Sequence, residues 1–215
     1  MVTLPVPLEW PDALTLPREL SAGLRFTPEQ FAQLCAANPD AVLELTADGH
    51  LIAMTPTGGE TGRRNSRLAF QLQAWAHQQG GWEVFDSSTG FRLPDGSVLS
   101  PDASAVQRER WQALTPEQRR GFPPLCPDLV IELASPSDEG PRGITALRRK
   151  MKAFVANGAQ LAWLISPEER FVEIWRGTGS QEAGLAPERL AAAAVLEGGS
   201  AFPGLRLELE EIWAV

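Results

Sequence analysis

The order of hydrophobic and polar positions along the chain predicts alternating strands and helices. Short apolar runs bounded by proline, glycine or serine are typical of buried strands, whereas apolar residues three or four positions apart are typical of amphipathic helices. Helices of this kind begin near Glu60 and near Ile144. The clearest strand candidates are residues 82–86, 103–106, 129–134 and 161–165.

Because alternating strands and helices pack as layers, we expect an α/β fold with a mixed, curved β-sheet flanked by α-helices. The strand at Trp82, a second strand at Phe91 and the strand that follows Asp102 are joined by short turns. This succession predicts an antiparallel meander. Residues 107–125 are polar and rich in proline, which predicts helical turns in a surface insertion.

The N-terminal region adds a helix and a hairpin to this core. Residues 27–30, Thr-Pro-Glu-Gln, have the pattern of a capping box with proline at the first helical position. Asp48-Gly49 lies between two apolar runs and predicts a tight hairpin. Several prolines before residue 18 indicate an extended arm. We therefore expect an arm over residues 1–24 and a single domain over residues 25–215.

Composition and charge narrow the possible partners. The chain has 215 residues, of which 43% are hydrophobic and 21% charged, as is ordinary for a globular protein. Its net charge of −8 opposes broad contact with phosphates, which needs clustered Lys and Arg. A nucleic-acid site would therefore be a local basic patch. Cys35 and Cys126 form no disulfide framework, and the N-terminus lacks a signal-peptide pattern, so we expect a cytoplasmic protein.

Two carboxylates stand out as candidates for chemistry. Glu132 lies in the apolar run at 129–134, where an ionised carboxylate is costly without a partner or a cation. Asp102 follows Pro101 and opens the strand at 103–106. Neighbouring strands would thus offer the oxygen ligands that Mg²⁺ prefers, and we expect a divalent-metal site. The alternatives are a Glu132 paired with an arginine and an Asp102 that only occupies a turn.

A lysine would complete this group, and the helix that begins near Ile144 supplies two. Met151 and Phe154 mark its apolar face. At about 100° per residue, Lys150 lies on the margin of that face and Lys152 points towards solvent. A marginal lysine can lay its methylenes along the core and bring its ammonium to the strand ends. We therefore favour Lys150, the alternative being a side chain that extends into water.

Other polar residues are weaker candidates. Asp128 also follows a proline, but it lies about 13 Å along the strand from Glu132, so we expect it to cap the strand entry. His50 and His77 are the only histidines, and their positions fit structural or solvated residues. A Ser–His or Cys–His nucleophile system is therefore not expected.

A series of short motifs runs over about residues 27–213. The motifs lie at residues 56–59, 89–94, 100–102 (Ser-Pro-Asp), 127–137, 150–151, 157–158, 163–167 and 203–205. In this order they resemble the PD-(D/E)XK nuclease superfamily and, more closely, its Uma-type family of predicted restriction endonucleases.

The resemblance implies a restriction-endonuclease-like core that hydrolyses DNA phosphodiester bonds with Mg²⁺ or Mn²⁺. It implies that Asp102, Glu132 and the carbonyl group of Leu133 hold the metal. Lys150 would then orient the attacking water or the phosphate. Glu60 would join the outer shell of the metal, although an acid at that position could equally be stabilised by the helix N-terminus alone.

The chain departs from the superfamily pattern at Ala134, where the Glu-x-Lys triplet would place its lysine. Two other function classes therefore stay open. One is a catalytically degenerate nuclease fold that serves as a binding or regulatory module. The other is a hydrolase of small phosphoesters, which an acidic surface would suit.

Two features bear on partners. Arginines near the two helix starts could form a local phosphate-binding patch or merely a solvated face, and they are Arg63, Arg64, Arg67, Arg142, Arg148 and Arg149. The proline-rich arm, with Trp10 and Trp213 near the termini, leads us to expect a homodimer, because exposed aromatic surface usually marks an interface.

Overall fold

A computed structural model describes residues 24–138, 141–177 and 186–214 of the chain. Residues 1–23 of the expected arm lie outside the described residues, so the division into arm and domain stays a prediction. No helix within the described part of the chain is long and apolar enough to cross a membrane.

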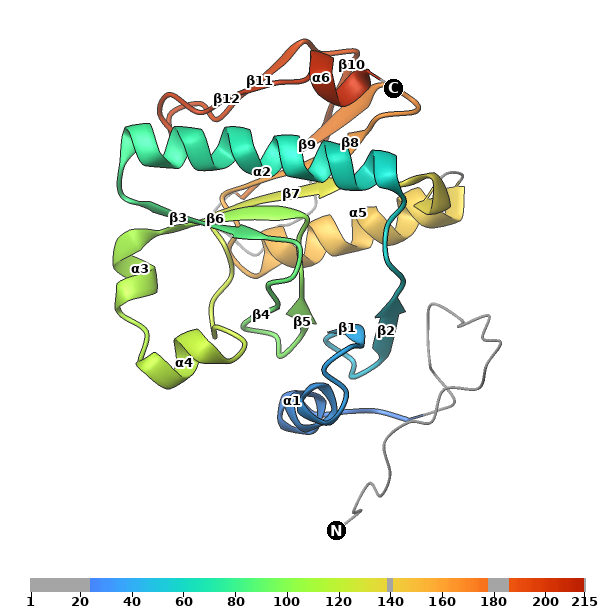
Figure 1. Cartoon of the computed structure of the whole chain (residues 1–215), viewed down its shortest axis with the longest axis vertical. Coiled ribbons are helices and arrows are strands. Elements are labelled where there is room, and N and C mark those ends of the chain that lie inside the picture. Colours follow the sequence, from blue (N-terminus) through green and yellow to red (C-terminus); the bar gives the residue numbers. More distant parts are fainter. Residues whose placement is uncertain (1–23, 139–140, 178–185, 215) are drawn as a thin grey trace.

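A large sheet forms the centre of the molecule (Figure 1). Its strands are β3 (Trp82–Asp86), β6 (Ala103–Gln107), β7 (Leu129–Leu133), β8 (Leu161–Ser166), β9 (Phe171–Arg176) and β10 (Glu188–Ala191). They lie in the order β10-β9-β8-β7-β6-β3. Only β7 and β8 are parallel neighbours, and the other pairs are antiparallel. The predicted mixed sheet, with the Asp102 and Glu132 strands side by side, is confirmed.

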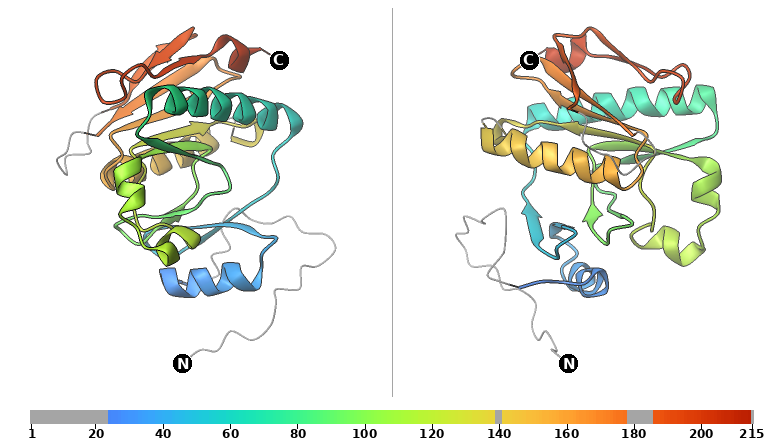
Figure 2. Two further views of the ribbon diagram at one scale, coloured as in Figure 1. Left: turned by 60° about the vertical axis from the view of Figure 1, so that its left-hand side comes forward. Right: turned by 180° about the vertical axis from the view of Figure 1, so that it is seen from behind.

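Two long helices cover the opposite faces of this sheet (Figures 1 and 2). They are α2 (Gly59–Gln79) and α5 (Pro141–Ala156). Leu68 of α2 and Met151 of α5 are each fully buried, in separate apolar clusters. α2 stops at Gly80, whose φ of +71° suits glycine. Both predicted helices are confirmed, although α5 begins three residues before Ile144.

A small sheet lies below the large one (Figure 1). Its strands are β1 (Val42–Leu45), β2 (Leu51–Met54), β4 (Phe91–Arg92) and β5 (Val98–Leu99), in the order β2-β1-β5-β4. The predicted hairpin is therefore confirmed, and its strand β1 pairs with β5. The predicted meander is wrong: β4 turns back onto β5, and β3 pairs directly with β6. Strands of two residues carry too little hydrophobic pattern to be read from sequence.

The helix before this hairpin begins as its sequence predicts. α1 (Pro28–Ala37) has Thr27 as its N-cap. The Thr27 hydroxyl accepts a hydrogen bond from the Gln30 amide, and the Gln30 side chain accepts one from the Thr27 amide. This reciprocal capping satisfies two amides that a helix start leaves free.

The remaining elements lie on the outside. The predicted surface insertion contains α3 (Arg108–Gln112) and α4 (Pro116–Arg120), and a 3₁₀ turn follows β7 at Pro136–Asp138. The C-terminal segment packs on α2 and consists of β11 (Val195–Glu197), β12 (Arg206–Glu208) and α6 (Glu210–Trp213).

The tryptophans of the described residues do not form an exposed surface. Trp213 is buried and its indole N–H donates to the carbonyl oxygen of Ala193. Trp75 and Trp82 pack against each other inside the core. Trp213 therefore gives the expected homodimer no support, and the dimer stays a prediction.

Candidate active site

The register of the large sheet brings Asp102 and Glu132 together. Asp102 directly precedes Ala103, which lies opposite Ile131 on β7. Side chains alternate along β7: Ile131 belongs to the cluster on the α2 side and Val130 to the cluster on the α5 side. Glu132 therefore points towards α5, the helix that carries the candidate lysine.

Asp102 is held on both carboxylate oxygens. Its Oδ2 accepts the Leu133 amide at 2.8 Å, and its Oδ1 accepts the Asn65 side-chain amide of α2 at 2.9 Å. Burial raises the pKa of Asp102 above its ordinary value, and these hydrogen bonds together with the charge of Lys150 oppose that rise. The carboxylate is thus fixed in orientation before any ligand arrives.

Lys150 reaches three oxygen atoms at once. Its Nζ lies 2.8 Å from Oε1 of Glu132, 2.8 Å from Oε1 of Glu44 and 2.8 Å from the carbonyl oxygen of Ser100. Its side chain is only 13% exposed, whereas Lys152 on the same helix is exposed. The phase of the helix therefore brings Lys150, and not Lys152, to the strand ends.

Sequence reasoning missed Glu44 and Asn65. Glu44 is buried on β1, and it joins the cluster through Lys150 and through the Ser100 amide, from which its Oε1 accepts a hydrogen bond of 2.7 Å. A usable signal was present, since Glu44 interrupts the apolar run Val42-Leu43-Glu44-Leu45 much as Glu132 interrupts its own strand. Asn65 carried no such signal among the polar residues around it.

The cluster holds more negative than positive charge. Burial raises the pKa of Glu132 to about 8, and the charges of Asp102 and Glu44 add to the rise while Lys150 opposes it. Burial alone would lower the pKa of Lys150, but Glu132 and Glu44 outweigh it and raise that pKa. These two carboxylates therefore favour the ammonium form of Lys150 in the metal-free cluster.

The donor set is compatible with a hydrated divalent cation. Within residues 24–138, 141–177 and 186–214, no three His, Cys, Asp or Glu side chains are arranged to enclose a metal ion by themselves. Mg²⁺ does not need such a cage, because it usually keeps several waters and takes one or two carboxylates. Oδ1 of Asn65 is buried without a hydrogen-bond donor among the described residues, whereas Oε1 of Glu132 lies 2.8 Å from the Lys150 ammonium. The unpartnered amide oxygen and the two neighbouring carboxylates fit a cation with its water.

Two other predicted residues lie differently. Leu133 enters the cluster through its amide, and a ligand role for its carbonyl oxygen stays a prediction. Glu60 is exposed in the first turn of α2, and no hydrogen bond or ion pair joins it to the described residues of the cluster. Its role also stays a prediction.

Asp128, set apart from the metal group on distance, has structural partners of its own. It accepts hydrogen bonds from the Gln107 amide and the Gln160 side chain and forms an ion pair of 2.6 Å with Arg110. It thereby ties the starts of β7 and β8 to the end of β6.

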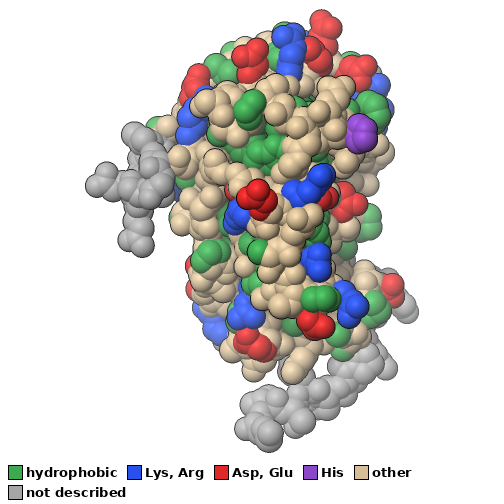
Figure 3. Space-filling model, turned by 90° about the vertical axis from the view of Figure 1, so that its left-hand side faces the viewer, with side chains coloured by type: hydrophobic (Ala, Val, Ile, Leu, Met, Phe, Trp, Pro, Cys, Tyr) green, Lys and Arg blue, Asp and Glu red, His purple; other side chains and the backbone are tan. Residues whose placement is uncertain are grey.

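Most of the arginines proposed for a phosphate patch bind the protein itself. Arg63 and Arg67 donate to backbone carbonyl oxygens of the C-terminal segment, each at 2.7 Å. Arg64 is buried and pairs with Glu168, and Arg148 pairs with Glu173. The side chain of Arg142 lies outside the described residues. Figure 3 shows a different face, which carries α3 and α4, and on it basic and acidic side chains are interspersed.

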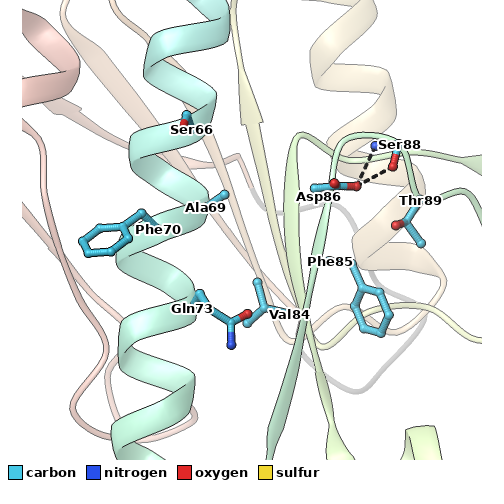
Figure 4. Close-up of a pocket in the computed structure, with 9 residues that line it drawn as sticks. All are labelled: Ser66, Ala69, Phe70, Gln73, Val84, Phe85, Asp86, Ser88 and Thr89. Atoms are coloured by element: carbon cyan, nitrogen blue, oxygen red, sulfur yellow. Dashed lines mark hydrogen bonds between the residues drawn. The ribbon is translucent and has the colours of Figure 1, made fainter.

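A groove of about 690 Å³ lies between α2 and β3 (Figure 4). Phe70, 73% exposed, projects from α2 beside it. On the other side, Asp86 accepts hydrogen bonds from the amide and hydroxyl of Ser88. Asp86 lies opposite Ala103, next to Asp102, and Ser66 of the groove follows Asn65. Two residues that line the groove are therefore neighbours, in sequence or in strand register, of residues that belong to the candidate site.

Comparisons with known proteins agree with this architecture. A crystal structure described as that of a putative nuclease belonging to DUF820, from Anabaena variabilis ATCC 29413, superposes with a TM-score of 0.68 at 20% sequence identity, covering 87% of this chain and 97% of that one. Nothing among the curated proteins matches the chain. The sequence model of the Uma2 family, described as "Putative restriction endonuclease", matches residues 28–210. With most of its length matched and the same fold in a solved structure, the chain belongs to the Uma2 family.

Proposed function

We propose that this protein is a divalent-metal-dependent endonuclease that hydrolyses DNA phosphodiester bonds. The observation that carries the proposal is the convergence of Glu132 and Glu44 on a single buried lysine, with Asp102 held beside Glu132 by the Leu133 amide. One ammonium cannot balance all three carboxylates once they are ionised, and a divalent cation would supply the remaining positive charge. Membership of the Uma2 family supports nuclease chemistry over other uses of such a site.

Asp102 and Glu132 are the side chains that would hold Mg²⁺ or Mn²⁺, with the carbonyl oxygen of Leu133 as a third ligand. The bound ion would supply a water of lowered pKa and offset negative charge on the phosphate. Asn65 keeps the Asp102 carboxylate oriented through its hydrogen bond. The positive charge of Lys150 would help to orient the phosphate or the attacking water and would stabilise the charge that develops in the transition state.

Metal-dependent cleavage tests this proposal directly. Supercoiled plasmid, single-stranded DNA, RNA and a small chromogenic phosphodiester are each incubated with Mg²⁺, Mn²⁺ or EDTA. We expect DNA cleavage that EDTA abolishes and that Asp102→Asn loses while its circular dichroism spectrum is unchanged. A matched control is Asp128→Asn, which alters a buried aspartate outside the cluster and should retain cleavage once its fold is verified.

The same assay separates the rival functions. Turnover of the small phosphodiester alone would favour a small-molecule hydrolase, which the burial of Glu44 and Glu132 and the net charge of −8 would suit. No cleavage of any substrate, together with no binding of Mn²⁺ by calorimetry, would contradict an enzyme and favour a degenerate fold that acts as a binding module.

We also propose a homodimer, as expected from the sequence. Sedimentation at micromolar concentration checks it, and a monomer throughout that range would contradict it. The three most exposed large apolar side chains of the described residues, which are Leu24, Val42 and Phe70, are the first positions to substitute if a dimer is found.

A further inference from the structure

Glu44 comes from the small sheet, yet its contacts lie in the candidate site. A single oxygen, Oε1, accepts the Ser100 amide at 2.7 Å and lies 2.8 Å from Nζ of Lys150. The residue is 3% exposed. One buried carboxylate oxygen therefore fixes both a backbone position and an ammonium group.

Ser100 lies where the chain passes from the small sheet to the large one. It follows β5 and precedes Pro101 and Asp102, which lead into β6. Its N–H donates to Glu44, and its carbonyl oxygen accepts from Lys150. The backbone N–H and C=O of Ser100 are thus both held, two residues before a proposed metal ligand. Glu44 and Lys150 together therefore fix the backbone position that leads into Asp102.

Lys150 is shared between two carboxylates at equal distances of 2.8 Å. If Glu44 were absent, Glu132 would be the one carboxylate of the described residues left in an ion pair with the ammonium. The lysine would then lose the contact that holds it at β1, and its position relative to Glu132 would change. Glu44 keeps the ammonium between the two sheets, in a place from which it can reach a phosphate.

We propose that Glu44 is a positioning residue of the hydrolytic site, which holds Lys150 between the two carboxylates and fixes the Ser100–Asp102 turn. This inference rests on the proposed nuclease function. A merely stabilising role is the competing explanation, but buried ion pairs are weak evidence for stability, since desolvation offsets most of their attraction. Arg148 on the same helix forms such a pair with buried Glu173, and Glu173→Gln therefore serves as the matched control.

The chain offers an unusually direct measurement, because Lys150 and Lys152 are its only lysines. In protein labelled with ¹⁵N at lysine Nζ, a buried, hydrogen-bonded ammonium exchanges slowly enough to give a signal, whereas an exposed one does not. We expect one such signal, lost in Lys150→Arg and retained in Lys152→Arg. In Glu44→Ala it should disappear or shift, because Nζ loses one acceptor.

Kinetics at saturating Mn²⁺ complete the test. We expect Glu44→Ala to lower kcat at least tenfold and to leave KM within about twofold. Glu44→Gln should recover most of the rate, since an amide oxygen can accept both hydrogen bonds. Glu173→Gln should leave both the ammonium signal and kcat near their wild-type values.

The outcomes distinguish this inference from the function on which it rests. An unchanged signal and rate in Glu44→Ala, or an equal loss of rate in Glu173→Gln, would overturn the positioning role. Absence of metal-dependent cleavage by the wild-type protein would overturn the proposed function instead, and any loss of signal in Glu44→Ala would then reflect a structural contact alone.

Discussion

The raised pKa of Glu132 predicts that removing its charge stabilises the metal-free protein, and does so more at high pH. The pKa rises from 4.5 to about 8 on folding, so the folded state binds this proton more tightly than the unfolded chain. Stability from this group is therefore fully present below pH 4.5 and is lost as pH rises towards 8. Because glutamine cannot ionise, the Glu132→Gln variant does not lose this stability as pH rises.

The size of the effect follows from the shift. At roughly 1.4 kcal/mol per pKa unit, linkage makes wild-type folding about 3 kcal/mol less favourable at pH 8 than at pH 5 through this one group. The difference in free energy of unfolding, Glu132→Gln minus wild type, should therefore grow by about 3 kcal/mol over that range.

Urea unfolding in EDTA at pH 5, 6, 7 and 8 measures this difference. Glu117→Gln on α4, where the residue is exposed, controls for the loss of a carboxylate as such. A difference that stays flat, or that shrinks as pH rises, would refute the reasoning. It would mean that Glu132 is ionised throughout and that its ion pair with Lys150 outweighs the cost of burial.

Three further predictions concern the neighbours of this carboxylate. Asn65→Ala removes a hydrogen bond to Asp102 and should weaken Mn²⁺ binding roughly tenfold, the equivalent of about 1.4 kcal/mol. Calorimetry measures this affinity, and an unchanged value would contradict the role of Asn65 in orienting Asp102. Lys150→Ala should abolish cleavage and spare Mn²⁺ binding, whereas Lys152→Ala should affect neither, and the reverse result would contradict the helix phase. Phe154→Ala opens a cavity in the fully buried cluster under α5 and should cost about 3–5 kcal/mol of unfolding free energy, with a loss below 1 kcal/mol contradicting that packing.

The sequence was most informative where local pattern and tertiary role coincide. The apolar run that contains Glu132 predicted a buried strand, and the spacing of Met151 and Phe154 predicted which lysine reaches it. Both depend on periodicity within one element, which burial then enforces. The end of α2 at Gly80 also follows from a local signal, because glycine adopts the positive φ of that position without strain.

Glu44 shows why the rest could not be read in advance. Its place in Val42–Leu45 suggested an ordinary hairpin strand, in which a charged side chain points to solvent. Only the pairing of β1 with β5, set by Leu45 and Val98, turns it towards α5. The charged residue within an apolar run was a local sign of burial, but nothing local identifies β5 as the partner strand, because a strand of two residues carries almost no pattern.

The route of the chain through Ser100 makes the small sheet part of the chemistry rather than an appendage. If β1 detached, the nuclease-like core would keep Asp102 and Glu132 but lose the group that restrains Lys150. A fragment that begins after the hairpin could therefore fold and bind a cation without turning over substrate. Exchanging the N-terminal hairpin between members of the family would, for the same reason, exchange a piece of the catalytic machinery.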